Sequence, residues 1–233
     1  MKWQSFDSSD ALSAAAAETL LAAIRDDPRI VLGLPTGRTP IGMYDRVVRE
    51  CSREYHCFRD VTTFNLDEYA GVPPEHPGSY FTYMKQHLFD HVDIDPLNTH
   101  IPDGTAPDRE AECRRYEADI REHGGLTLTF LGLGRNGHIG FNEPGTPFDS
   151  RTRVVQLTQS TRHANADLFP DGHVPTHALT MGIGTILESR RIVLLAAGAG
   201  KEEAIARLRS GEVSEAFPAS ALHKHGDVIV LAM

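Results

Sequence analysis

The chain has 233 residues, of which 40% are hydrophobic and 24% are charged, and its formal net charge is -9. This composition is typical of a globular protein with an apolar core, and the acidic balance argues against a nucleic-acid-binding surface. No apolar run is long enough for a transmembrane helix, and the first residues lack the pattern of a signal peptide. The cysteines Cys51, Cys57 and Cys113 have no metal-ligand or redox spacing, so we expect reduced thiols in a cytoplasmic protein.

Short apolar runs alternate with helical segments along the whole chain. We predict strands over residues 29–34, 61–65, 126–131, 152–156, 191–196 and 227–232. We predict helices over residues 10–25, with Asp10 as the cap, and over 40–55, 79–90, 109–123, 160–168, 181–189 and 201–209, and a loop over 67–79. This alternation predicts an α/β fold, a mostly parallel sheet with helices on both faces, in a single domain that spans residues 1–233.

In such a fold, the loops that follow the strands meet at one edge of the sheet, where ligands bind. The first of these loops, 33–40, reads Gly-Leu-Pro-Thr-Gly-Arg-Thr-Pro and leads into a helix. Gly37 frees the backbone, Thr36 and Thr39 offer hydroxyl groups, and the helix N-terminus favours a phosphate. The spacing fits neither a P-loop nor a dinucleotide fingerprint, so an ordinary strand–helix turn remains an equal alternative.

Four acidic or basic side chains lie on two other loops. Residues 131–145 contain five glycines, together with His138 and Glu143, which is typical of an active-site loop. Asp67 and Glu68 follow the second strand, and because adjacent side chains of an extended chain point oppositely, only one of them should face the crevice. A carboxylate there could remove a proton next to a carbonyl group, although a solvated acidic turn is the plainer alternative.

Lys201 follows a glycine-rich turn after the strand at 191–196 and opens a helix. A cation at a helix N-terminus opposes the helix dipole, so this lysine indicates an anion bound at the same place. A lysine that simply points to solvent is the alternative.

These four loops together resemble those of the glucosamine-6-phosphate deaminase (isomerase) family, and the likeness covers nearly the whole chain in the family's order. The most specific stretch is Gly-His-Ile-Gly-Phe-Asn-Glu-Pro at residues 137–144. The related 6-phosphogluconolactonases share the fold and a Gly-His in this loop but lack the Phe-Asn-Glu-Pro continuation. The resemblance therefore favours the deaminases over the lactonases.

The resemblance implies a Rossmann-like sheet and the conversion of D-glucosamine 6-phosphate and water to D-fructose 6-phosphate and ammonia, in the breakdown of N-acetylglucosamine. It implies no metal and no organic cofactor. By the family's motifs, Asp67 moves a proton between C2 and C1, and His138 opens the sugar ring with support from Asn136 and Glu143. The substrate, a phosphorylated amino sugar, is expected on Thr36, Gly37, Arg38, Thr39 and Lys201.

The chain departs from the family pattern at three places. Asn136 stands where some members have an aspartate. Asp167 stands where the family usually has a phosphate-binding arginine, and Arg38 stands where a small residue is common. We hypothesise that Arg38 supplies the charge that position 167 lost, and galactosamine 6-phosphate stays open as a substrate. The chain ends at Met233, without the extension of the allosteric hexamers, so we expect a non-allosteric monomer.

Two other classes of protein compete with this interpretation. A metal-dependent hydrolase could use Asp67, His138 and Glu143 with further histidines as ligands, namely His76, His87 and His100, but no helical metal motif is present. A sugar-phosphate sensor with a dead site is the second, but no basic helix-turn-helix is evident, and all three acid–base residues are retained. We expect no nucleic-acid or membrane partner.

Overall fold

The computed structural model describes residues 1–53, 57–170 and 172–233. Its main sheet has the strand order β1-β10-β9-β6-β2-β3-β5, and every neighbouring pair in it is parallel. The bounds of these strands are β1 Lys2–Ser5, β2 Val31–Leu34, β3 Thr62–Asn65, β5 Thr99–His100, β6 Leu128–Gly132, β9 Arg191–Ala196 and β10 Val228–Ala232. The predicted α/β fold with a mostly parallel sheet is confirmed.

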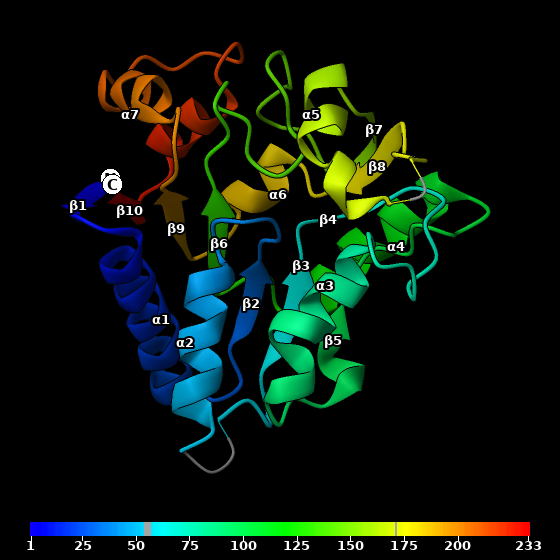
Figure 1. Cartoon of the computed structure of the whole chain (residues 1–233), viewed down its shortest axis with the longest axis horizontal. Coiled ribbons are helices and arrows are strands. Elements are labelled where there is room, and N and C mark those ends of the chain that lie inside the picture. The colour runs from blue at the N-terminus through cyan, green and yellow to red at the C-terminus, as the bar shows by residue number, and fades with distance from the viewer. Residues whose placement is uncertain (54–56, 171) are drawn as a thin grey trace.

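Helices cover both faces of this sheet (Figure 1). Their bounds are α1 Ser9–Asp26, α2 Ile41–Cys51, α3 Tyr80–His87, α4 Arg109–Glu122, α5 Gln159–Ala164, α6 Ile183–Leu187 and α7 Glu202–Arg209. Four short 3-10 helices join them: η1 Phe89–His91, η2 Pro96–Asn98, η3 Ala166–Leu168 and η4 Pro218–Lys224.

The alternation of side chains along each strand divides the core into two layers. In β9, Val193 and Leu195 pack with α1, α2 and α3, whereas Ile192 and Leu194 pack with α4, α6, α7 and η4. Strand residues of both kinds are buried, because a parallel sheet with two covered faces exposes neither of them. The strands are therefore held rigidly, and their ends give fixed positions to the loops that follow.

A second sheet, which the sequence did not predict, stands beyond the carboxyl ends of the main strands. It pairs β4 Asp67–Tyr69, β8 His177–Thr180 and β7 Arg153–Gln156 in the order β4-β8-β7, all antiparallel. In Figure 1 the arrows of β9, β6, β2 and β3 point towards this sheet and towards α5. The prediction of a loop from residue 67 is wrong for its first three residues, because their pairing partner is more than a hundred residues away in sequence.

Most of the other predicted elements are present with small shifts of their ends. Helix α1 is capped by Ser8, whose Oγ accepts a hydrogen bond from Ala11 N at 3.1 Å, and Asp10 lies in its first turn rather than at the predicted cap. The predicted helix over 40–55 ends at Cys51, and its last two residues lie outside the described part of the chain. The predicted strand at 152–156 exists as β7 but belongs to the small sheet.

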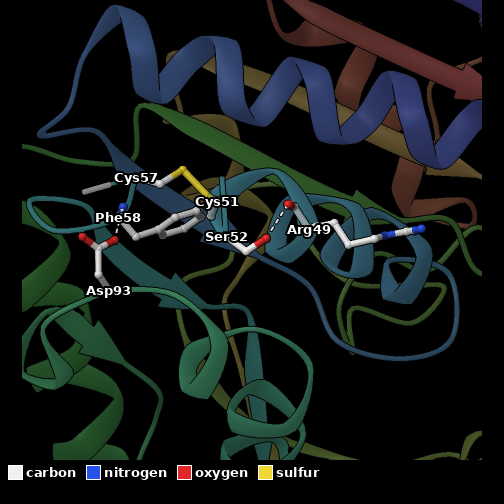
Figure 2. The surroundings of a disulfide bond; sticks show 6 residues. All are labelled: Arg49, Cys51, Ser52, Cys57, Phe58 and Asp93. Carbon is white, nitrogen blue, oxygen red and sulfur yellow. Dashed lines mark hydrogen bonds between the residues drawn. A yellow bond between two sulfur atoms is a disulfide. The ribbon is translucent and has the colours of Figure 1, made fainter. Parts of the chain in front are cut away.

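The expectation of three reduced thiols is wrong for two of them. Figure 2 shows a disulfide between Cys51, at the end of α2, and Cys57. Beside it, Phe58 N donates a hydrogen bond to Asp93 Oδ1 at 2.7 Å, which joins this turn to the segment after η1. Cys113 is a buried free thiol. Among the described residues, no helix has both the length and the apolar character needed to span a membrane.

Candidate active site

A crevice of about 220 Å³ opens where the loops after β2, β3, β6 and β9 meet α5. Its walls contain seven of the nine predicted site residues: Thr36, Gly37, Arg38, Thr39, Asp67, His138 and Lys201. The other two, Asn136 and Glu143, instead contact the Nδ1 side of His138. The fold therefore brings together residues from four loops that are far apart in the sequence.

Asp67 is the buried carboxyl group of this crevice. Its pairing with Thr180 at the start of β4 fixes its backbone, and the residue as a whole is only 5% exposed. Gly140 lies against it, because a Cβ built at Gly140 would come 3.4 Å from Asp67 Oδ2, and the φ of +55° there also favours glycine. Burial, together with the nearby Glu68, raises the pKa of Asp67 to about 8.

Glu68 points away from the crevice, as the alternation along an extended chain predicts. Its carboxylate accepts hydrogen bonds from the backbone N–H groups of Tyr69 at 2.7 Å, Tyr80 at 2.9 Å and Phe81 at 2.9 Å. Two of these donors belong to the first turn of α3, so Glu68 ties β4 to that helix. Burial raises the pKa of Glu68 to about 7, against the lowering effect of the three N–H groups.

His138 is held in one tautomer by Asn136. The His138 Nδ1 and Asn136 Oδ1 atoms are 2.7 Å apart, and Asn136 Nδ2 donates to Glu143 Oε2 at 2.7 Å. A carboxylate only accepts hydrogen bonds, so the amide nitrogen must face Glu143 and the amide oxygen must face the imidazole. Nδ1 therefore carries the proton, and Nε2 keeps its lone pair.

Glu143 is fixed in turn by α5. Thr161 Oγ1 donates to Glu143 Oε1 at 2.7 Å, and Thr158, whose Oγ1 also caps α5, lies 3.4 Å from the same oxygen. The Glu143 Oε2 atom is 3.9 Å from His138 Nδ1, so Asn136 transmits its influence on the imidazole. Burial lowers the pKa of His138, opposed by the charge of Glu143, and the ring is therefore held neutral.

The fit around the imidazole leaves no room for a side chain at Gly134. A Cβ at this position would come 2.3 Å from the His138 ring. The Gly134 carbonyl accepts a hydrogen bond from Gly137 N, and Gly134 N donates to the His138 carbonyl, which closes a tight turn around the ring. The glycines of this loop therefore serve to place the histidine.

The cations of the crevice stand on the loops after β2 and β9. Lys201 caps α7 and donates a hydrogen bond from Nζ to Thr39 Oγ1 at 3.1 Å. Burial, with a smaller effect of Arg135, lowers the pKa of Lys201 to about 8. Gly37 has a φ of +89°, and its carbonyl accepts a hydrogen bond from Tyr83 Oη at 2.7 Å, which fixes the turn between Thr36 and Thr39.

Comparison with known proteins shows which family has this fold and sequence. The family model described as glucosamine-6-phosphate isomerases/6-phosphogluconolactonase matches residues 5–230. The chain belongs to this family. It is 53% identical to a glucosamine-6-phosphate deaminase of Bacillus velezensis over 94% of this chain and 92% of that protein. The family likeness expected from the four loops is confirmed.

Solved structures of the same family agree with the fold. A structure described as a monomeric glucosamine-6-phosphate deaminase superposes with a TM-score of 0.97, at 51% identity, over 100% of this chain and 97% of that one. A 6-phosphogluconolactonase from Thermotoga maritima superposes with a TM-score of 0.76 at 18% identity, over 100% of this chain and 99% of that one, a likeness of fold alone. Within the family, the chain is thus similar in sequence as well as in fold to the deaminases.

Several residues that line this crevice were not predicted from the sequence, and four of them are Tyr80, Phe141, Thr161 and Asn165. Tyr80 and Phe141 belong to the apolar cluster around the small sheet, which had not been predicted. Thr161 lies on α5 and Asn165 directly follows this helix, and their sequence gives no sign that the helix reaches Glu143. Phe141 follows His138 in the specific motif, so it was the one residue of the four with a usable signal.

The structure also bears on the metal-hydrolase alternative. Within residues 1–53, 57–170 and 172–233, no three histidine, cysteine, aspartate or glutamate side chains are grouped so that they could hold a metal ion. His100 stacks on Phe64, with ring centroids 4.4 Å apart, and His76 stacks on Phe169. Of the further histidines suggested as ligands, His76 and His100 thus lie in aromatic contacts.

Proposed function

We propose that the chain converts D-glucosamine 6-phosphate and water to D-fructose 6-phosphate and ammonia. The observation that carries this proposal is the placement of Asp67 and His138, from different loops, in one crevice with Lys201. Aldose–ketose isomerisation needs one group that opens the ring and a second group that moves the C2 proton. The similarity to glucosamine-6-phosphate deaminases over nearly the whole chain supports the same assignment.

In the proposed first step, His138 opens the pyranose ring. Its Nε2 is unprotonated while Nδ1–H is held by Asn136, so Nε2 accepts the proton of the anomeric hydroxyl group and returns a proton to the ring oxygen. The lowered pKa of His138 suits this exchange, because the ring starts neutral. Glu143 stabilises the transient imidazolium through Asn136.

In the proposed second step, Asp67 takes the proton from C2 and delivers it to C1. Its burial keeps water from the carboxyl group, and its raised pKa makes the carboxylate a stronger base than a surface aspartate. The substrate carries an ammonium group on C2, and a cation at that distance would favour the ionised form of Asp67 in the complex. Substrate binding itself would then activate the base.

The 6-phosphate is proposed to lie on the turn after β2 and on Lys201. Lys201 Nζ and Thr39 Oγ1 are already in contact, and both line the crevice with Thr36, Gly37 and Arg38. Lysine beside hydroxyl and backbone N–H groups is a common setting for phosphate. An anion there would also restore the pKa of Lys201, which burial lowers.

We further propose a single catalytic domain that acts as a monomer in the cytoplasm, as a hydrolase of N-acetylglucosamine catabolism. The solved relative described as monomeric supports the first part of this proposal, and the family match over residues 5–230 supports one domain. The disulfide between Cys51 and Cys57 withdraws the argument for the cytoplasm from reduced thiols, so that assignment rests on the family resemblance.

The proposal is tested by ammonia release from three substrates offered to the purified chain: glucosamine 6-phosphate, galactosamine 6-phosphate and 6-phosphogluconolactone. We expect ammonia and fructose 6-phosphate from the first, with activity retained in EDTA. Faster turnover of the galactosamine epimer would change the substrate, and lactone hydrolysis without deamination would reject the proposal. Loss of activity in EDTA that zinc restores would favour the metal hydrolase.

A further inference from the structure

Two segments that line the crevice are joined at its rim by an ion pair. Arg38 belongs to the turn after β2, and its Nη2 lies 3.1 Å from Oδ2 of Asp167 in η3. Arg38 lines the crevice, and α5 with the Asn165 that joins it to η3 contributes Thr161, Ala164 and Asn165 to the same walls. The pair therefore crosses from one wall of the site to another, over a sequence separation of 129 residues.

Both partners of this pair are in water. The side chains of Arg38 and Asp167 are 83% and 85% exposed. An exposed pair of this kind contributes little to stability, because solvent screens it and because two long side chains must be ordered to form it. A competing anion can therefore displace the carboxylate without disturbing the fold.

A phosphate group is a strong competitor for this arginine. The guanidinium carries five N–H donors, and phosphate accepts two of them in a paired geometry with two negative charges near neutral pH. In the structure, Arg38 contacts Asp167 through Nη2 alone.

We propose that Asp167 determines ligand specificity by competing with the substrate phosphate for Arg38. The proposal rests on the function proposed above, in that the competing ligand is a sugar 6-phosphate. Arg38 then contributes to binding only after its contact with Asp167 has broken. The free energy needed to break that contact lowers the affinity of the site for every phosphorylated ligand. A ligand without phosphate does not provoke the exchange and is unaffected by the pair.

The test is a titration calorimetry cycle with fructose 6-phosphate as the probe and fructose as the unphosphorylated control. The variants are Arg38→Ala, Asp167→Asn and the double variant. Glu18→Gln is the matched control, since Glu18 forms an exposed ion pair with Arg25 on α1 and the variant removes the same charge. Circular dichroism on each variant checks that the fold is retained.

We expect Asp167→Asn to tighten fructose 6-phosphate by about threefold, the scale of an exposed ion pair. Arg38→Ala should weaken it by about tenfold, as loss of an arginine–phosphate contact does. In the Arg38→Ala background, Asp167→Asn should change affinity by less than about twofold, because the partner for which it competes is gone. Glu18→Gln should leave the affinity unchanged.

Three results would overturn the inference. Unchanged or weaker binding by Asp167→Asn would mean that Asp167 is inert or positions Arg38 rather than competing for it. An equal gain in the Arg38→Ala background would mean that Asp167 acts on the phosphate directly. Absence of fructose 6-phosphate binding by the wild-type chain would remove the site itself.

Two measurements on the same variants distinguish a failure of this inference from a failure of the proposed function. Binding is measured without turnover, and ammonia release is measured in parallel. A chain that binds fructose 6-phosphate with the expected cycle but releases no ammonia would keep the Arg38–Asp167 competition and reject the deaminase. Ammonia release with no effect of Asp167→Asn on affinity would do the reverse.

Discussion

The two ends of the crevice differ in burial and in the number of contacts that hold their side chains. At the catalytic end, defined by Asp67, His138, Asn136 and Glu143, the imidazole and the supporting amide and carboxylate are linked by hydrogen bonds of 2.7 Å, and Asp67 is buried. At the phosphate rim, defined by Arg38 and Asp167, one exposed contact joins two side chains. The first arrangement fixes a protonation state and an orientation, whereas the second can exchange its partner.

This difference predicts how the two ends respond to substitution. A substitution within a buried hydrogen-bonded chain leaves a polar group without a partner and costs the desolvation of that group. A substitution at an exposed rim alters a contact that water and salt already weaken. A change of charge at position 167 should therefore leave the fold intact and act on ligand affinity rather than on the chemistry.

The largest expected effect comes from Asp67→Asn, which keeps the shape of the side chain and removes the base. We expect kcat to fall by about 10³-fold or more, within the range of a general base, while fructose 6-phosphate still binds. Proton NMR of C2 exchange in deuterated water is the decisive measurement. Exchange at the wild-type rate would remove Asp67 from this role and weaken the contrast between the two ends.

The next largest effect is expected from Gly134→Ala, because a Cβ there would come 2.3 Å from the His138 ring and force it to move. We expect kcat to fall by about 10²-fold, the scale that misplacement of a catalytic group produces, with little change in KM. Gly226→Ala is the control, since a Cβ at Gly226 meets nothing within 4 Å. Equal kinetics of the two variants would show that the histidine is not rigidly placed.

A somewhat smaller loss is expected from Asn136→Ala, which frees the imidazole to adopt the other tautomer. We expect kcat to fall by about 30-fold, below the full value of a general base, because Nε2 can still act in a fraction of molecules. Asn136→Asp retains an acceptor for Nδ1–H and should keep more activity, with a higher pKa for His138 in an NMR titration. Full activity of Asn136→Ala would indicate that Glu143 orients the ring without this amide.

The pH dependence of kcat/KM should report on Asp67 at the catalytic end and on Lys201, which we assign to the phosphate. Asp67 acts as the base only when ionised, and its pKa of about 8 means that kcat/KM rises with pH up to that value, by about tenfold per unit well below it. Lys201 loses its charge above a pKa of about 8, so phosphate binding and kcat/KM fall beyond it. Lys201→Arg should move only the alkaline limb upward. A flat profile between pH 6 and pH 9 would contradict these assignments.

The smallest effect should come from salt. Because the rim is exposed, raising ionic strength to about 0.5 M should raise KM by a few fold through screening of the cations. The buried catalytic end is screened much less, so kcat should stay constant. A parallel fall of kcat with salt would contradict the distinction between the buried catalytic end and the exposed phosphate rim.

The site residues could be predicted from the sequence because they lie on loops that follow strands. The alternation of strands and helices predicted a parallel sheet, and the carboxyl ends of such strands meet at one edge. Seven predicted residues lie on the crevice for this reason. The alternation rule also assigned Asp67 and Glu68 to opposite directions before any contact was known.

What the sequence could not supply depends on contacts between distant segments. Strand β4 exists because β8 pairs with it, and a three-residue strand has no periodicity of its own to detect. Thr161 reaches Glu143, and Asp167 reaches Arg38, only because α5 and η3 fold over the loops. The disulfide likewise depends on Cys57 lying next to Cys51 in the folded chain, which their spacing in the sequence does not reveal.

The amino-acid sequence by itself predicted five strands of the main sheet, most of the helices and the chemical groups on the loops, because these follow from local periodicity and from glycine-bearing turns. The edge strands β1 and β5 were not predicted, because they are short and exposed or half-buried. The tertiary structure decided which of those groups contact one another. In it, Asn136 forms hydrogen bonds with both His138 and Glu143, and Asp167 forms an ion pair with Arg38. Burial and hydrogen-bond geometry arise only when separate segments pack, so the protonation states of the site belong to the fold and not to the motif.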